Sequence, residues 1–333
     1  MNKHQLLRIF SWLTVITVTA GSVNAQVDPH FSQYFIQPMT LNPALTGAIE
    51  GDYRVSAVWR SQYGNSLVTK GLSAEAPTNK NINLGMNIQH QSSSDGAYSY
   101  TNGYLNFAYT GVKFGDHQIV LAMQGGFMNR RFDLNKLHYG DQWVAGVGFD
   151  PSIASSENFF KPSAASVDIG TGIAYYDGRA GQKVSLFGGV AAYHLTRPTD
   201  PFLNGGDKLR MPVRYSFHLG ARMYISETLD LIPNVLYMRQ GNAQEKMIGA
   251  YAQMFGGANT DLMFGANYRF DDAISPFAGV YHKGVTLGLS YDVNASNKTQ
   301  GFINRSSMEV SLSYSGWGGK SELKTKPFYC PRF

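Results

Sequence analysis

Apolar and polar residues alternate through most of this chain. In residues 305–316, which read RSSMEVSLSYSG, an apolar side chain stands at every second position from Met308 to Tyr314, with serines and Glu309 between them. A period of two residues is that of a β-strand with one apolar and one polar face. The same alternation recurs at 82–89, 215–225 and 262–269. The apolar faces of so many strands need a common solvent, and lipid is the simplest candidate.

Fourteen segments carry strand-like patterns, and the lengths of their connections follow a rule. The segments are 52–62, 67–75, 82–93, 98–114, 118–133, 166–177, 183–196, 213–226, 229–239, 246–255, 262–270, 274–282, 285–294 and 306–316. Connections after even-numbered strands are short, whereas the long connections at 134–165, 197–212 and 295–305 follow odd-numbered strands. Outer-membrane barrels have an even number of strands, short periplasmic turns and longer outer loops, and a soluble sandwich gives no reason for this segregation.

We therefore predict an all-β fold, a transmembrane outer-membrane antiparallel β-barrel of about 14 strands over residues 52–316. Its outer face would contact the lipid of the bacterial outer membrane. Since the chain enters the first strand and leaves the last strand at the short-turn end, both termini are expected in the periplasm. Residues 26–51 would then form a periplasmic or plug-like segment, and residues 317–333 a periplasmic tail.

The first 25 residues have the features of an export signal. Lys3 and Arg8 precede a short apolar run, and Val23 and Ala25 place small residues before the expected cleavage point. The alternative is an uncleaved anchor. No later stretch reaches the roughly 18 apolar residues of a transmembrane helix.

Composition supports the same class of protein. Charged residues make up 15% of the chain and aromatic residues 13%, with 36 glycines. A mean hydropathy of −0.22 excludes a helical membrane bundle, whereas a barrel balances polar inward residues against apolar outward ones. The net charge of +5 is spread along the chain without a basic patch, so no nucleic-acid partner is expected. Cys330 is the only cysteine and cannot form an intrachain disulfide.

Residues that carry chemistry do not form a recognisable catalytic pattern. The eight histidines are scattered without a metal-binding or catalytic spacing, so we expect no enzyme activity, no metal and no cofactor. Asp271 and Asp272 read as a solvated turn, with a cation site in an outer loop as the alternative. Charged residues on the polar faces are expected to face the lumen, either as a salt-bridge network or as a selectivity constriction. These lumen candidates are His218, Arg222, Arg269 and Glu309.

The two segments outside the barrel contain unusual clusters of aromatic residues. Residues 26–51 hold three prolines that interrupt regular structure, and their aromatic side chains need burial in the lumen or against a periplasmic partner. The alternative is a disordered leader. Phe328, Tyr329 and Phe333 lie in the tail, where they are expected to contact a partner or to serve as an assembly signal.

Residues 27–63 carry a long motif that resembles the start of the mature PorP/SprF family. The matching positions are Asp28-Pro29, Phe31-Ser32-Gln33-Tyr34, Asn42-Pro43-Ala44, Gly47, Tyr53-Arg54 and Trp59-Arg60, with shorter matches as far as Pro331-Arg332-Phe333. The resemblance implies a non-enzymatic outer-membrane component of the type IX secretion and gliding motility machinery. It also implies a role in the export or surface anchoring of adhesins that carry C-terminal sorting domains.

The resemblance further implies two kinds of partner, the C-terminal domains of secreted adhesins and periplasmic components of the secretion machine. Candidate partner residues are Phe31, Ser32, Gln33, Tyr34, Asn42, Pro43 and Ala44, together with the three aromatic residues of the tail. The alternative function is a passive outer-membrane channel for small solutes, which has no evident need for such an N-terminal segment.

Overall fold

The computed structural model describes residues 28–78, 80–156, 162–179, 181–199, 210–257, 259–294 and 306–317. The predicted signal peptide therefore lies outside the described residues, as does the tail beyond Trp317 with Phe328, Tyr329 and Phe333.

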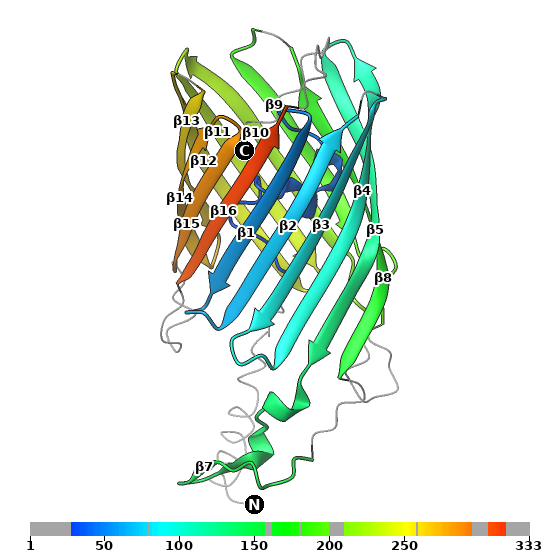
Figure 1. Ribbon diagram of the computed structural model, residues 1–333, viewed down its shortest axis with the longest axis vertical. Coiled ribbons are helices and arrows are strands. Elements are labelled where there is room, and N and C mark those ends of the chain that lie inside the picture. Colours follow the sequence, from blue (N-terminus) through cyan, green and yellow to red (C-terminus); the bar gives the residue numbers. More distant parts are fainter. Residues whose placement is uncertain are drawn as a thin grey trace, which may run out of the picture.

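The described chain forms a closed antiparallel barrel of fourteen strands (Figure 1). The strands are β1 (Tyr53–Gln62), β2 (Leu67–Pro77), β3 (Ile82–Ser93), β4 (Tyr98–Phe114), β5 (His117–Phe132), β8 (Ser163–Asp177), β9 (Val184–Tyr193), β10 (Arg214–Ser226), β11 (Leu229–Gln240), β12 (Ala243–Gly256), β13 (Thr260–Arg269), β14 (Ala273–His282), β15 (Val285–Asn294) and β16 (Ser307–Gly316). Each strand pairs with its neighbours along the chain, and β1 pairs with β16 from Tyr53↔Gly316 to Ser61↔Met308. Closure gives each strand of the barrel a neighbour on both sides. The predicted fold and strand number are confirmed, with ends that differ by a few residues.

The connection after β5 has structure that the sequence did not indicate. It contains two short 3₁₀ turns, η3 (Leu134–Lys136) and η4 (Gly140–Gln142), and a small hairpin of β6 (Trp143–Val144) and β7 (Gly148–Phe149). This hairpin projects from the lower end of the barrel in Figure 1, which we call the long-loop end. Strands of two residues give no detectable periodicity, so sequence patterning read the whole region as a loop.

The two faces of the barrel wall differ as the alternation predicts. On β15 and β16, Leu287, Leu289 and Leu312 are exposed on the outside, whereas Ser290 and Glu309 are buried on the inside. The outer wall is thus an apolar surface suited to lipid. No helix among the described residues is long and apolar enough to cross a membrane.

Residues 28–52, which we call the plug, occupy the barrel lumen and appear in dark blue inside the barrel in Figure 1. The plug contains two 3₁₀ turns, η1 (Pro38–Thr40) and η2 (Pro43–Leu45). Its apolar side chains form two clusters with inward side chains of the wall. Leu41, Ala44 and Leu45 belong to one cluster, and Phe31, Phe35 and Ile36 to the other.

The plug crosses the lumen from one end to the other, and this corrects one expectation. Asp28 contacts Gln240 and His194, which follow or end strands at the long-loop end, whereas the backbone N–H of Asp52 donates to Gly316 at the short-turn end. The described chain therefore begins and ends at opposite ends of the barrel. The described residues do not meet the expectation that both chain ends lie on the same side. That expectation rested on the number of strands, which does not determine where the segment before β1 runs.

The outward face of β15 allows a test of the register. Leu289→Arg should lower the free energy of unfolding by about 2–4 kcal/mol if the residue lies near the middle of the membrane, because the guanidinium would face lipid. Asn294→Arg at the end of the same strand is the matched control and should cost at most about 1 kcal/mol. The measurement is the unfolding of the barrel in lipid vesicles. Equal effects at the two positions would contradict the assignment of Leu289 to the lipid face.

Candidate functional site: a plug hydrogen-bonded to the barrel wall

The 3₁₀ turns of the plug follow from local sequence. Pro38 and Pro43 each open a turn, where a fixed φ is favourable and a missing N–H costs nothing. The side chain of Asn42 caps the second turn by accepting from the backbone N–H of Ala44 at 2.9 Å. The Asn42-Pro43-Ala44 motif thus builds a compact turn in a segment that has no strand or helix to satisfy its backbone groups.

The other end of the Asn42 amide binds the barrel wall. Its Nδ2 donates to the carbonyls of Ile173 on β8 and Val190 on β9, at 3.0 and 3.3 Å, and lies 3.1 Å from Nε2 of His218. The wall residues at this point are Gly172 and Gly189, which have no side chain. A Cβ at either position would overlap the Asn42 amide. The glycines therefore let the plug approach the backbone of the wall, which side chains would otherwise cover.

Glu309 on β16 holds the start of the plug. Its two carboxylate oxygens accept from the backbone N–H groups of Ser32 and Gln33, both at 2.8 Å. Ser311 on the same strand donates to the side-chain oxygen of Gln33 at 2.8 Å. Glu309 is 2% exposed, so these are charge-assisted bonds in a dry environment. The last strand of the barrel thus supplies a principal seat of the plug.

Two arginines connect the wall to the same part of the plug. Arg60 on β1 and Arg269 on β13 both pair with Asp292 on β15, at 3.0 and 2.7 Å. Arg60 also donates to the carbonyl of His30, and Arg269 to the hydroxyl of Ser32, both at 3.0 Å. The cluster joins three strands and the plug, so that each buried charge has an opposite charge beside it.

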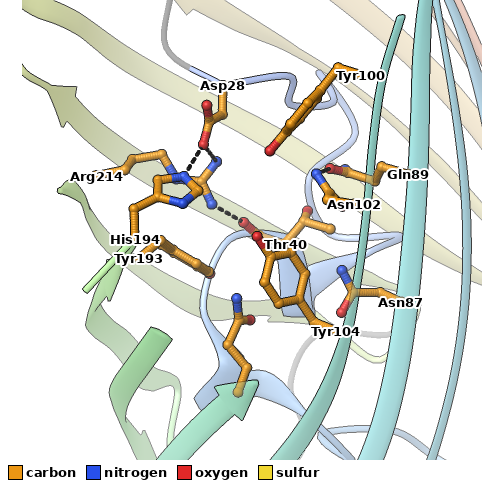
Figure 2. A pocket seen from close by; sticks show the side chains of 11 residues that line it. Asp28, Thr40, Asn87, Gln89, Tyr100, Asn102, Tyr104, Tyr193, His194 and Arg214 are labelled. Atoms are coloured by element: carbon orange, nitrogen blue, oxygen red, sulfur yellow. Dashed lines mark hydrogen bonds and ion pairs between the residues drawn. The ribbon is translucent and has the colours of Figure 1, made fainter. Parts of the chain in front are cut away.

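A second charged cluster surrounds Asp28 (Figure 2). His194 lies between two carboxylates, with Nε2 against Asp28 and Nδ1 2.8 Å from Asp168. Gln240 donates to Asp28 at 3.1 Å, and Arg214 lies 3.9 Å from it. Beside this cluster is a small polar cavity of about 20 Å³.

These contacts shift the proton affinities of the cluster. Burial alone would raise the pKa of Asp28, but His194 and Arg214 outweigh it and hold that pKa far below its usual range. Burial alone would lower the pKa of His194, but the carboxylates of Asp28 and Asp168 raise it to about 9. Both groups are therefore charged at neutral pH, and both nitrogens of the imidazole are engaged.

The structure brings together most of the residues that the sequence singled out. Phe31, Ser32, Gln33, Tyr34, Asn42, Pro43 and Ala44 all lie in the lumen, and His218, Arg269 and Glu309 contact the plug. Arg222 pairs instead with Asp230 on the neighbouring strand. Asp272 pairs with Arg269 at 2.8 Å, and among the described residues no group of three or more His, Cys, Asp or Glu side chains has an arrangement that could hold a metal ion.

Sequence reasoning missed the partners of Asp28 and the central role of Asp292. Asp28, Asp168, His194 and Arg214 are far apart along the chain and meet only because the plug crosses the lumen. The one available signal was period-two patterning, which places Asp168 and Asp292 on inward faces.

The seat at Glu309 can be tested by removing its carboxylate. Glu309→Ala should leave two buried N–H donors of the plug without an acceptor, at a cost of about 1–3 kcal/mol each. Glu227→Ala, in an exposed turn, is the matched control and should have little effect. The measurement is the temperature at which the detergent-solubilised barrel loses its folded gel migration. A transition unchanged by Glu309→Ala would show that this seat does not stabilise the protein.

The charge on His194 predicts a dependence on pH. Since its folded pKa of about 9 exceeds the usual value of 6.5, protonation of His194 contributes stability that is fully present below pH 6.5 and is lost as the pH rises through about 9. The contribution of Asp28 has the opposite sign and is lost only as the pH falls through its lowered pKa. The unfolding temperature should therefore fall from about pH 7 to about pH 10, and less so in His194→Gln. Identical pH profiles for the two proteins would refute this assignment.

Comparison with solved structures shows that this architecture is shared at low sequence identity. A deltaS2S3 mutant of TodX, a monoaromatic hydrocarbon channel, matches with 10% identity and a TM-score of 0.51 over 83% of this chain and 93% of that chain. The toluene transporter TodX of Pseudomonas putida matches with 8% identity and a TM-score of 0.50 over 85% and 93%. Identities this low show the barrel fold alone.

Comparison with families is more specific. A comparison with curated proteins found no match. The family model described as type IX secretion system membrane protein PorP/SprF matches residues 23–314, which include the plug and nearly all of the barrel. With the barrel fold, this match supports a location in the bacterial outer membrane. The chain belongs to the PorP/SprF family of type IX secretion system membrane proteins.

Proposed function

We propose that this chain is a non-enzymatic outer-membrane component of the type IX secretion and gliding motility machinery that supports export or surface anchoring of adhesins with C-terminal sorting domains. The observation that carries the proposal is the family match over residues 23–314, which includes the plug motif. Adhesin C-terminal domains and periplasmic components of the machine are the partners proposed, and Phe328, Tyr329 and Phe333 of the tail are candidates for the periplasmic contact.

The filled lumen favours this role over that of a passive channel. Solute would have to pass a plug whose backbone is bonded to Glu309 and whose Asn42 amide is bonded to the wall. Displacing the plug would leave several buried polar groups without partners, each at a cost of about 1–3 kcal/mol. The TodX structures are named as a channel and a transporter, and they resemble this chain only in fold.

The charged clusters of the lumen favour structural work over catalysis. A general base needs a free position toward its substrate. Both nitrogens of His194 are occupied by carboxylates, and His218 lies against the Asn42 amide. These groups bind the plug, and this supports the proposal that the protein is not an enzyme.

The orientation in the membrane is also part of the proposal. Long loops of outer-membrane barrels face outward, so the long-loop end with Asp28 and the β6–β7 hairpin would face the cell exterior. The short-turn end with Gly316 would then face the periplasm and direct the tail toward the secretion machine. The external end would be available to secreted adhesins.

Gene deletion with complementation separates the two functions. Deletion should remove adhesins from the cell surface and leave small-solute uptake unchanged, and the full chain should restore display. A chain truncated after Gly319 should still migrate as a folded barrel but should display less adhesin, because the proposed periplasmic contact is missing. Intact adhesin display with reduced solute uptake in the deletion strain would instead establish the channel function.

A further inference from the structure

A cavity of about 530 Å³ opens at the long-loop end of the barrel, beside the start of the plug. We call it the vestibule and define it by His30 of the plug, Arg60 and Arg269 of the wall, and the residues Gln62, Tyr63 and Gln244 at the rim of the long-loop end. Its volume lies within the range of about 300–1,000 Å³ that is typical of small-molecule sites. The plug residues Asp28, Pro29 and His30 line the vestibule on the side toward the lumen.

The charged side chains that line the vestibule are balanced in sign, with Arg60, Arg130, Lys246 and Arg269 on one side of the balance and Asp28, Glu245, Asp271 and Asp272 on the other, and several of them have an opposite charge beside them. His30 lies 2.6 Å from Glu245, Arg60 lies 3.0 Å from Asp292, and Arg269 lies 2.8 Å from Asp272. An ionic ligand would therefore have to compete with a counter-charge already in place on each of these groups. This pairing favours an uncharged ligand.

The same pairs present hydrogen-bond donors and acceptors side by side. A guanidinium next to a carboxylate can donate to and accept from one hydroxyl group, and the amides of Gln62 and Gln244 can also do both. Groups of this kind match adjacent hydroxyls, each of which both donates and accepts, better than they match the separated N–H and C=O groups of a peptide.

Aromatic rings complete the lining. Tyr63, Tyr98 and Phe270 line the vestibule, and Tyr63 and Phe270 are exposed. An aromatic ring offers a flat apolar surface, with a polar group at its edge in tyrosine. The C–H face of a sugar ring packs on such a surface while its hydroxyls reach polar neighbours.

We propose that the vestibule binds an uncharged oligosaccharide, with Gln62, Gln244 and Tyr63 as contact residues. The inference does not depend on the proposed role in adhesin export. Two sources present the same sugar chemistry at a cell surface, namely soluble polysaccharide fragments and the sugar chains of lipopolysaccharide. Sugar hydroxyls would contact the paired charges and amides, and a ring face would pack on Tyr63.

Binding to the purified full-length protein in detergent tests the proposal. The probes are maltotriose, xylotriose, chitotriose and lipopolysaccharide purified from the host outer membrane, measured by calorimetry. At least one probe should bind with a Kd on the order of 1 mM or tighter. Gln244→Ala and Tyr63→Ala should each weaken that binding by about threefold to tenfold, the effect of losing one hydrogen bond or one packing contact.

Matched controls separate binding in the vestibule from effects on the fold. Gln182→Ala and Tyr224→Ala change the same residue types at exposed positions away from the vestibule, near the short-turn end, and should leave affinity unchanged. Binding of the trisaccharides identifies soluble glycans as a source. Binding of lipopolysaccharide alone, weakened by the vestibule variants, identifies the membrane sugar chains.

Three results would overturn the proposal. One is the absence of binding by every probe at concentrations well above 1 mM, on the order of ten times that Kd. Another is lipopolysaccharide binding that is the same in the wild-type protein and both vestibule variants, which would place the lipid on the outer wall. The third is preferential binding of charged tripeptides in the vestibule, which would make it a peptide site.

Discussion

The structure depends on buried charges of the inner wall that are paired with one another and hydrogen-bonded to the plug. Arg60 and Arg269 converge on Asp292, while Glu309 accepts two backbone N–H groups of the plug. Removing one member would leave a buried charge or donor without compensation, which costs more than the net gain of an ordinary hydrogen bond. The plug therefore supplies partners to part of the polar inner face of the wall.

This constraint shapes the wall as well as the plug. The Asn42 amide reaches carbonyls of β8 and β9 only because Gly172 and Gly189 have no side chain. The plug also contacts the last strand through Glu309 and Ser311, so its seat is complete only when β16 has paired with β1. Plug and barrel thus form one cooperative unit, because each supplies partners that the other lacks.

Because the plug occupies the lumen, the accessible surfaces inside the barrel lie at its two ends. At the long-loop end the plug lines the vestibule, and at the short-turn end Asp52 leads directly into β1 beside Gly316. The two ends of the barrel therefore present different surfaces.

The sequence by itself determined the strands, their faces and the closed barrel, because these depend on local periodicity. On β16, Met308, Val310, Leu312 and Tyr314 face outward, because successive side chains of a strand alternate. The residues between them, Ser307, Glu309, Ser311 and Ser313, are buried on the inside. The sequence also singled out Glu309, His218 and the Asn42 turn as candidates.

The tertiary structure alone decided that Glu309 binds the plug backbone and that His194 bridges Asp28 and Asp168. The contacts of Glu309 with Gln33 and of His194 with Asp28 join residues more than a hundred positions apart in the sequence. They depend on the path of the plug, a segment without periodicity. For the same reason only the tertiary structure placed Asp28 at the long-loop end, since no local pattern records the direction in which an irregular segment crosses a barrel.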